Sequence, residues 1–323
     1  ALLFEDTRTR QPFTSFEEAF KSFNRRALLL GEPGGGKTVT LMATARQAAA
    51  DWLNGPDHNP LPILALISTW DSIQQPPLID WLGSKKDLSP EPVREVMTAG
   101  RALLLLDGLD ELGAERTEKK ADNIEERYDP RQRFIIALNA GLGENAALVT
   151  CREEEYKAIG QQAVLDGAVT LRQLTDGQIR DYLSADPGLG LLQAAIDADD
   201  GLRQMSRTPL LLSYLAFGFR DRPEALRDLK DLSEGDLRDA VFMSYMDKRY
   251  DRELKRLAKM GQEPPFTLEF IKEVLGRVAM EDACDKQSAI NLLEYESFVN
   301  VLPRGRINSF INFCLLLNYL NRR

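Results

Sequence analysis

Histidine and cysteine are scarce in this chain of 323 residues. His58 is the one histidine, and none of the three cysteines forms a C-x-x-C pair. These absences exclude a disulfide framework, a zinc site built from cysteines and a histidine-rich metal site. A Ser-His-Asp or Cys-His mechanism would depend on His58 alone, which stands in a run typical of a surface loop. Cys151 is therefore expected to be a small buried residue rather than a nucleophile.

Long apolar runs and an excess of basic charge are missing too. No apolar run approaches the ~18–20 residues that span a bilayer, and the start, ALLFEDTRTR, has no signal-peptide pattern. The 50 acidic residues outnumber the 41 basic ones, giving a formal net charge of −9, which argues against a nucleic-acid-binding surface over the whole protein. We therefore expect a soluble, cytoplasmic protein with no membrane segment and no direct nucleic-acid binding. The missing initiator Met indicates a piece of a longer protein.

Apolar stretches separated by helical patterns predict an α/β fold. Five short stretches are typical of buried strands: residues 27–30, 61–68, 102–106, 146–150 and 168–174. Helical patterns lie between them at residues 38–53, 78–83 and 91–100. We therefore expect a mostly parallel five-stranded sheet flanked by helices. The charge-rich residues 112–133 are expected to form a solvated loop or a surface helix.

The pattern changes after residue 174, where strand candidates stop. Helical patterns follow at residues 176–184, 189–197, 201–220, 223–230, 236–260, 267–284 and 286–300. The expected divisions are a helical lead-in (1–25), an α/β domain (26–174), a helical domain (175–235) and a further helical part (236–323). The lead-in depends on a spacing of three and four, typical of one helix face, between Phe13, Phe16, Phe20 and Phe23.

The residues from Gly31 to Thr38, GEPGGGKT, match the pattern G-x-x-x-x-G-K-[ST] of a phosphate-binding loop. The glycines let successive backbone N–H groups turn toward phosphate oxygens, and the start of the following helix adds its positive end. Lys37 is expected to reach the β- and γ-phosphates, and the Thr38 hydroxyl to bind Mg²⁺. The residues expected to bind nucleotide here are Gly31, Glu32, Pro33, Gly34, Gly35, Gly36, Lys37, Thr38 and Val39.

A second motif, LLLLDGLDEL, runs from Leu103 to Leu112. An Asp at the end of a buried strand is how P-loop enzymes hold Mg²⁺ opposite the phosphate loop, so Asp107 is expected to bind the metal. Asp110 and Glu111 follow the strand end, near the expected place of the γ-phosphate, and either could orient the attacking water. We favour Asp110 and keep Glu111 as the alternative.

Together, GEPGGGKT and LLLLDGLDEL resemble the NACHT family of STAND-class NTPases, bacterial members in particular. The distinguishing feature is a small residue after the first Asp, followed by acids at the third and fourth positions after it. Further likeness lies in LPILALISTW from Leu61, LVTCR ending at Arg152, LTDGQIRDYL from Leu174 and RTPLLL from Arg207. The resemblance covers roughly residues 12–230.

The resemblance implies roles for further residues. Arg152, at the end of a sensor strand, would contact the γ-phosphate, with Thr150 helping to orient it. Pro209, in the proline motif of a helical lid, would pack near the adenine. The alternatives are a surface ion pair with Glu153–Glu155 for Arg152, and ordinary helix-start chemistry capped by Thr208 for Pro209. The expected catalytic residues are then Lys37, Asp110, Glu111 and Arg152.

The resemblance also assigns the domains. Residues 26–174 would be the nucleotide-binding P-loop domain, residues 175–235 the helical lid, and residues 236–323 the start of a winged-helix domain. Relatives use a winged-helix histidine to contact the β-phosphate of ADP. This sequence has no equivalent histidine and stops at Arg323, so we expect a truncated winged helix.

The implied function is a nucleotide-gated signalling switch. It would bind ATP or ADP with Mg²⁺, hydrolyse ATP slowly and self-associate when ATP-bound, under sensor and effector domains outside this sequence. A bacterial immune or anti-phage role is what the resemblance implies. Two alternatives stay open: an AAA+-like motor or loader acting on nucleic acid, which the acidic balance disfavours, and a small-molecule kinase, which the large helical second half disfavours.

Overall fold

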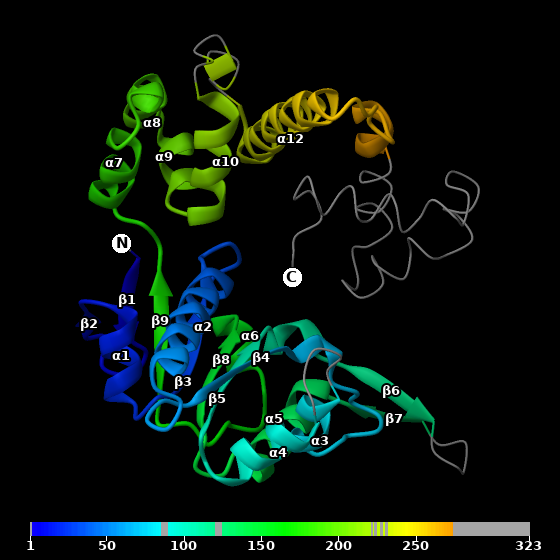
Figure 1. Ribbon diagram of the computed structural model, residues 1–323. Coiled ribbons are helices and arrows are strands. Elements are labelled where there is room, and N and C mark those ends of the chain that lie inside the picture. The colour runs from blue at the N-terminus through cyan, green and yellow to red at the C-terminus, as the bar shows by residue number, and fades with distance from the viewer. Residues whose placement is uncertain are drawn as a thin grey trace. The chain divides into compact units, whose positions relative to one another are not determined.

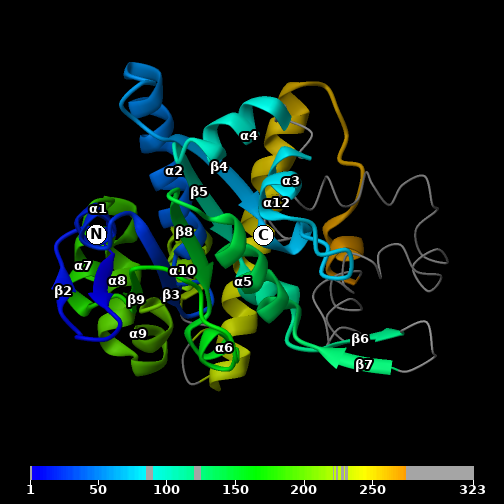
Figure 2. The same ribbon diagram turned by 90° about the horizontal axis from the view of Figure 1, so that it is seen from below.

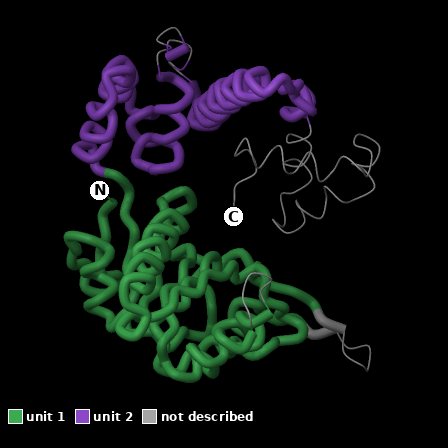
Figure 3. Tube along the Cα trace, in the orientation of Figure 1, with its two compact units in different colours: residues 1–174 green, residues 175–323 purple. Residues whose placement is uncertain are grey.

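A computed structural model describes residues 2–84, 90–119, 125–220, 222, 225–226, 229 and 232–273 (Figure 1). The chain divides into two compact units, residues 1–174 and residues 175–323 (Figure 3). The first unit contains the sheet, and the described part of the second contains helices.

The first unit is built on a seven-stranded sheet with the order β2-β1-β9-β3-β8-β5-β4. Five neighbouring strands are parallel, as the apolar stretches predicted, and β1 pairs antiparallel with both β2 and β9. The strands are β1 (Leu3–Asp6), β2 (Pro12–Phe13), β3 (Arg26–Gly31), β4 (Leu61–Leu66), β5 (Ala102–Asp107), β8 (Ala146–Cys151) and β9 (Gly167–Arg172).

The two additional strands correct the expectation that residues 1–25 form a purely helical lead-in. The expected helix is present as α1 (Phe16–Ser22), and Ser15 caps it by accepting the amide of Glu18. However, strand β1 precedes this helix. It forms because its residues pair with β9, where Leu3 lies opposite Arg172, near the other end of the unit's sequence. Glu5 also forms an ion pair with Arg172 at 2.6 Å. Local sequence carries no signal of a partner that lies so far along the chain.

Helices cover both faces of the sheet, which can be followed from below in Figure 2. Every residue of β5 is buried, and alternate side chains enter different cores. Leu103 and Leu105 pack with residues of α1 and α2, whereas Leu104 and Leu106 pack with residues of α3, α4 and α5. These helices are α2 (Lys37–Asn54), α3 (Leu78–Gly83), α4 (Pro90–Thr98) and α5 (Pro130–Gly141).

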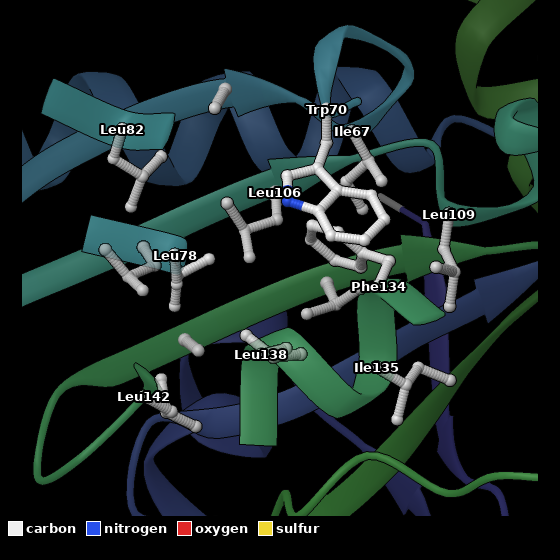
Figure 4. Packing of buried hydrophobic residues seen from close by; sticks show 14 of the residues in the cluster. Ile67, Trp70, Leu78, Leu82, Leu106, Leu109, Phe134, Ile135, Leu138 and Leu142 are labelled. Atoms are coloured by element: carbon white, nitrogen blue, oxygen red, sulfur yellow. The ribbon is translucent and has the colours of Figure 1, made fainter. Parts of the chain in front are cut away.

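Phe134 on α5 is at the centre of one core (Figure 4). Its ring makes edge-to-face contacts with Trp70 and Trp81, at centroid distances of 5.4 and 5.7 Å. Both indoles are buried. They therefore pack in the core and are not exposed for a ligand to stack on.

The loop or surface helix expected over residues 112–133 is only part of what the structure shows there. These residues contain a hairpin, β6 (Arg116–Lys119) and β7 (Glu125–Tyr128), that projects from the first unit (Figures 1 and 2). Tyr128 connects the base of the hairpin to the rest of the unit. The Tyr128 hydroxyl lies 3.2 Å from that of Ser72, and the guanidinium of Arg133 lies 3.5 Å from the centroid of the Tyr128 ring. Charged strands without apolar alternation give no hairpin signal in the sequence.

The described part of the second unit is helical. Its helices are α7 (Asp176–Ser184), α8 (Gly190–Ala198), α9 (Asp200–Ser206), α10 (Pro209–Phe219) and α12 (Glu234–Lys259). The single helix expected over residues 201–220 is two helices, because Pro209 has no N–H to continue α9 and instead begins α10. Thr175 and Gln178 form a capping box at the start of α7.

Several expectations fall outside the described residues. These are most of residues 223–230, residues 274–284 and 286–300, and the helix that the winged-helix resemblance implies at residues 307–323. Among the described helices, none is both long enough and apolar enough to cross a membrane.

Replacing the central aromatic ring tests this packing. Phe134→Ala should lower the free energy of unfolding by about 3–5 kcal/mol, because the ring is fully buried between two indoles. Urea unfolding followed by tryptophan fluorescence measures the change. Ile136→Ala on the exposed face of the same helix is the matched control and should stay within about 0.5 kcal/mol. Equal losses in the two variants would contradict the placement of Phe134.

Candidate functional site

The phosphate-binding loop connects β3 to α2 and curls as its glycines allow. Gly34 and Gly36 have φ values of 72° and 105°, which side chains other than glycine rarely tolerate. A Cβ on Gly35 would lie 3.0 Å from the carbonyl oxygen of Glu32, so a larger residue there would press on the backbone of the loop. Gly36 is the N-cap residue of α2, and the loop therefore presents the helix start to an anion.

Lys37 lies across this loop. Its Nζ donates to the carbonyl oxygens of Gly31 and Glu32 at 2.9 and 3.1 Å. The ammonium group is therefore held at the loop by its own backbone. Phosphate oxygens are stronger acceptors for this cation than neutral carbonyls, so the same side chain can exchange these contacts for a nucleotide.

Asp107, the last residue of β5, is buried, and its carboxylate accepts hydrogen bonds from two hydroxyl groups. Thr38 Oγ1 donates to its Oδ2 at 3.0 Å, and Thr150 Oγ1 donates to its Oδ1 at 2.6 Å. The Thr150 oxygen in turn accepts the amide of Gly108 at 2.8 Å. Sequence reasoning linked Thr150 to Arg152, whereas the hydroxyl positions Asp107. No local signal in the sequence indicates this contact, because it depends on the strand register that pairs Leu106 with Val149, the residue before Thr150.

The donor set around Asp107 fits Mg²⁺ held together with nucleotide phosphates. The carboxylate of Asp107 and the hydroxyl of Thr38 lie at the end of the phosphate loop, where α2 begins. Within the described residues, no group of three or more His, Cys, Asp or Glu side chains could hold a metal. Mg²⁺ commonly takes one or two protein ligands and completes its shell with phosphate and water, so these residues suit it.

Asp110 and Arg152 meet at the ends of two neighbouring strands. Arg152 Nε lies 2.8 Å from Asp110 Oδ2, and the Arg152 amide donates to Oδ1 at 3.3 Å. The Asp110 side chain is 7% exposed and that of Arg152 is 26% exposed. Arg152 thus pairs with Asp110, not with the adjacent acids Glu153–Glu155. These acids belong to α6 (Glu153–Lys157), of which Arg152 is the N-cap residue.

Glu111 takes a different place from Asp110. Its carboxyl group lies against Gly108, where an added Cβ would come within 2.8 Å of Glu111 Cδ. Gly108 has a φ of 81°, so glycine serves both the turn and this close approach. Of the two candidate acids, Asp110 forms the ion pair with Arg152 described above.

Cys151 is fully buried and lies between Thr150 and Arg152 in the chain. Burial, aided by the negative charge of Asp110, raises the pKa of its thiol to about 12. The thiol is therefore protonated at neutral pH and is a poor nucleophile.

The remaining candidates lie at the edge of this site or in the second unit. Glu32, Pro33 and Val39 are exposed around the loop. Pro209 is the first residue of α10, after Thr208, whose side chain makes no capping hydrogen bond. Because Pro209 belongs to the second unit, its contact with adenine stays a prediction.

The loop, the buried Asp107 and the mostly parallel sheet define the P-loop NTPase class. Residues 25–185 match the family model described as the NACHT domain, and the chain is therefore a NACHT-domain protein. A search of the curated proteins found no match.

The phosphate loop is tested through its lysine. Lys37→Ala should abolish nucleotide binding, because it removes the ammonium group that lies on the carbonyls of Gly31 and Glu32. Fluorescent nucleotide titration measures the affinity. Arg46→Ala, an exposed cation on the same helix, is the control and should bind normally. Tight ATP binding by Lys37→Ala would contradict the assignment of the loop.

The role of Thr150 is tested by an isosteric change. Thr150→Val should weaken Mg²⁺-dependent nucleotide binding about 10-fold, because Asp107 loses one of its two hydroxyl partners. Calorimetric titration of nucleotide with and without Mg²⁺ measures the effect. Thr170→Val removes a buried hydroxyl from β9 that bonds Thr7 instead, and should leave the Mg²⁺ dependence unchanged. The same loss in both variants would contradict a specific role for Thr150.

Proposed function

We propose that this protein is a nucleotide-gated switch of the STAND class. It binds ATP or ADP with Mg²⁺, hydrolyses ATP slowly and controls self-association of an effector. The observation that carries the proposal is the ion pair between Arg152 and Asp110, beside the Thr38–Asp107 contact. The cation expected to sense the terminal phosphate is here engaged by the acid expected to orient water.

Binding is the task of the loop and of α2. Backbone amides of the glycine loop and the positive end of α2 bind the phosphates, and Lys37 adds a cation that moves from the loop carbonyls to phosphate oxygens. Thr38 and Asp107 would hold Mg²⁺, which would supply charge neutralisation on the phosphates. These contacts are common to ATP and ADP.

Gating is the task of Arg152. A terminal phosphate offers its guanidinium a more highly charged acceptor than one carboxylate, so ATP separates Arg152 from Asp110 and ADP does not. The freed carboxylate of Asp110 then accepts a hydrogen bond from the attacking water. Hydrolysis removes the terminal phosphate, and the pair forms again.

The signalling context extends the same proposal. ATP favours an open form that self-associates, and ADP favours a closed one, through differential contacts with the terminal phosphate. Sensor and effector parts would lie outside these residues, and a bacterial immune or anti-phage role is supported by the resemblance of the motifs. The scarcity of cysteine supports action in the reducing cytoplasm.

The experiment for this proposal uses Asp110→Asn. The variant should bind ATP as the unchanged protein does but hydrolyse it at least about 100-fold more slowly, since the amide is a poor base for orienting water. Phosphate release measures turnover. Analytical ultracentrifugation of the same variant should show larger assemblies in ATP than in ADP.

Glu111→Gln is the comparison arm. Unchanged turnover in Asp110→Asn with a loss in Glu111→Gln would transfer the role to Glu111. Assemblies of equal mass in ATP and in ADP would contradict the proposed switch. Turnover stimulated by single-stranded or duplex DNA would favour the motor alternative instead.

A further inference from the structure

Arg131 is a buried cation that the nucleotide site does not use directly. It lies in the first turn of α5, and its side chain is only 3% exposed. Asp129, the N-cap residue of α5, accepts from Nε at 3.0 Å and from Nη2 at 2.7 Å. Glu155 of α6 accepts from Nη1 at 2.5 Å. The guanidinium thus connects the start of α5 to α6.

Apart from the pair with Arg131, the main contact of α6 with the rest of the unit is the packing of Tyr156 against the hydrophobic core. The helix is five residues long, and none of its residues is buried. Lys157 forms ion pairs with Glu153 and Glu154, which lie in the same helix and so do not hold it to the rest of the unit. The Tyr156 hydroxyl accepts the amide of Ala163, farther along the chain. The pair with Arg131 therefore anchors α6 to a neighbouring helix.

The position of α6 decides the position of Arg152. Arg152 is the N-cap residue of α6, and its carbonyl accepts the amide of Tyr156. On its other side, the chain enters from Cys151, the fixed last residue of β8. The direction of the Arg152 side chain toward Asp110 thus depends on where α6 begins, three residues before Glu155.

We infer that Arg131 is a positioning residue for Arg152, acting through Glu155. Asp129 holds the guanidinium rigidly at its own helix, and the remaining Nη1 fixes Glu155 and, through it, α6. The inference rests on the proposed function, in which Arg152 distinguishes ATP from ADP. A purely structural Arg131 would change stability alone and leave that distinction intact.

The test compares affinities for a non-hydrolysable ATP analogue and for ADP, each with Mg²⁺, by calorimetry on the full chain. Glu155→Ala should lower the ratio of ATP to ADP affinity about tenfold and leave ADP affinity unchanged, because Arg152 loses its fixed direction. Arg131→Met should do the same. Arg131→Lys should give a ratio between those of Arg131→Met and the unchanged protein. The lysine keeps the positive charge, but one ammonium cannot bond both carboxylates in the same geometry.

Lys157→Ala is the matched control, because it breaks ion pairs of the same helix without touching Arg131. It should keep the ratio of the unchanged protein. In Arg152→Ala, the ratio should fall, and adding Glu155→Ala to it should cause no further fall. Such non-additivity is what action through Arg152 requires.

The outcomes separate the two ideas. A fall in Arg152→Ala with no change in Glu155→Ala would overturn the inference and leave the proposed function standing. An unchanged ratio in Arg152→Ala would overturn both, because Arg152 would then not read the terminal phosphate. If Arg131→Met fails to fold, Glu155→Ala decides alone, since that side chain is 43% exposed and its removal leaves Arg131 paired with Asp129.

Discussion

The buried carboxylate of Asp107 is the constraint on which the site depends. It ends a strand whose other residues are all apolar and buried, so its charge would be costly without hydrogen-bonded partners. The partners are hydroxyls from two other elements, Thr38 of α2 and Thr150 of β8. One charge thereby fixes the start of the phosphate-loop helix against the ends of two strands.

The order of the strands makes this arrangement possible. Strand β8 lies between β3, which feeds the phosphate loop, and β5, which ends in Asp107. Parallel strands finish at the same edge of a sheet, so residues shortly after each strand meet there. Asp110 follows the end of β5, Arg152 follows the end of β8, and the two residues form the ion pair. The hydrogen bonds of Asp107 and the ion pair of Asp110 thus depend on the same strand register.

Local signals in the sequence identify much of this fold. The five parallel strands, the helix after the loop and the two motifs are all visible as apolar runs, helical spacing and glycine patterns. What is not visible depends on partners far along the chain. Strand β1 needs β9, and the hairpin β6–β7 needs two charged segments to find each other. The role of Thr150 likewise follows from register, because the sequence places it nearer to Arg152 than to Asp107.

The charges around α6 show the same limit. Three consecutive acids follow Arg152, and the sequence alone offers them as its alternative partners. In the structure, Glu153 and Glu154 pair with Lys157, while Glu155 pairs with Arg131. Acids in the first turn of a helix are favoured by its positive end and need no pairing with the N-cap residue.

Arg152 pairs with Asp110 instead. The two arginine side chains differ in how much of their surface is exposed. At 3% exposure, Arg131 is closed to an incoming anion, whereas Arg152, at 26%, can still be reached by one. A phosphate can therefore compete for Arg152 while the pair that anchors α6 stays intact.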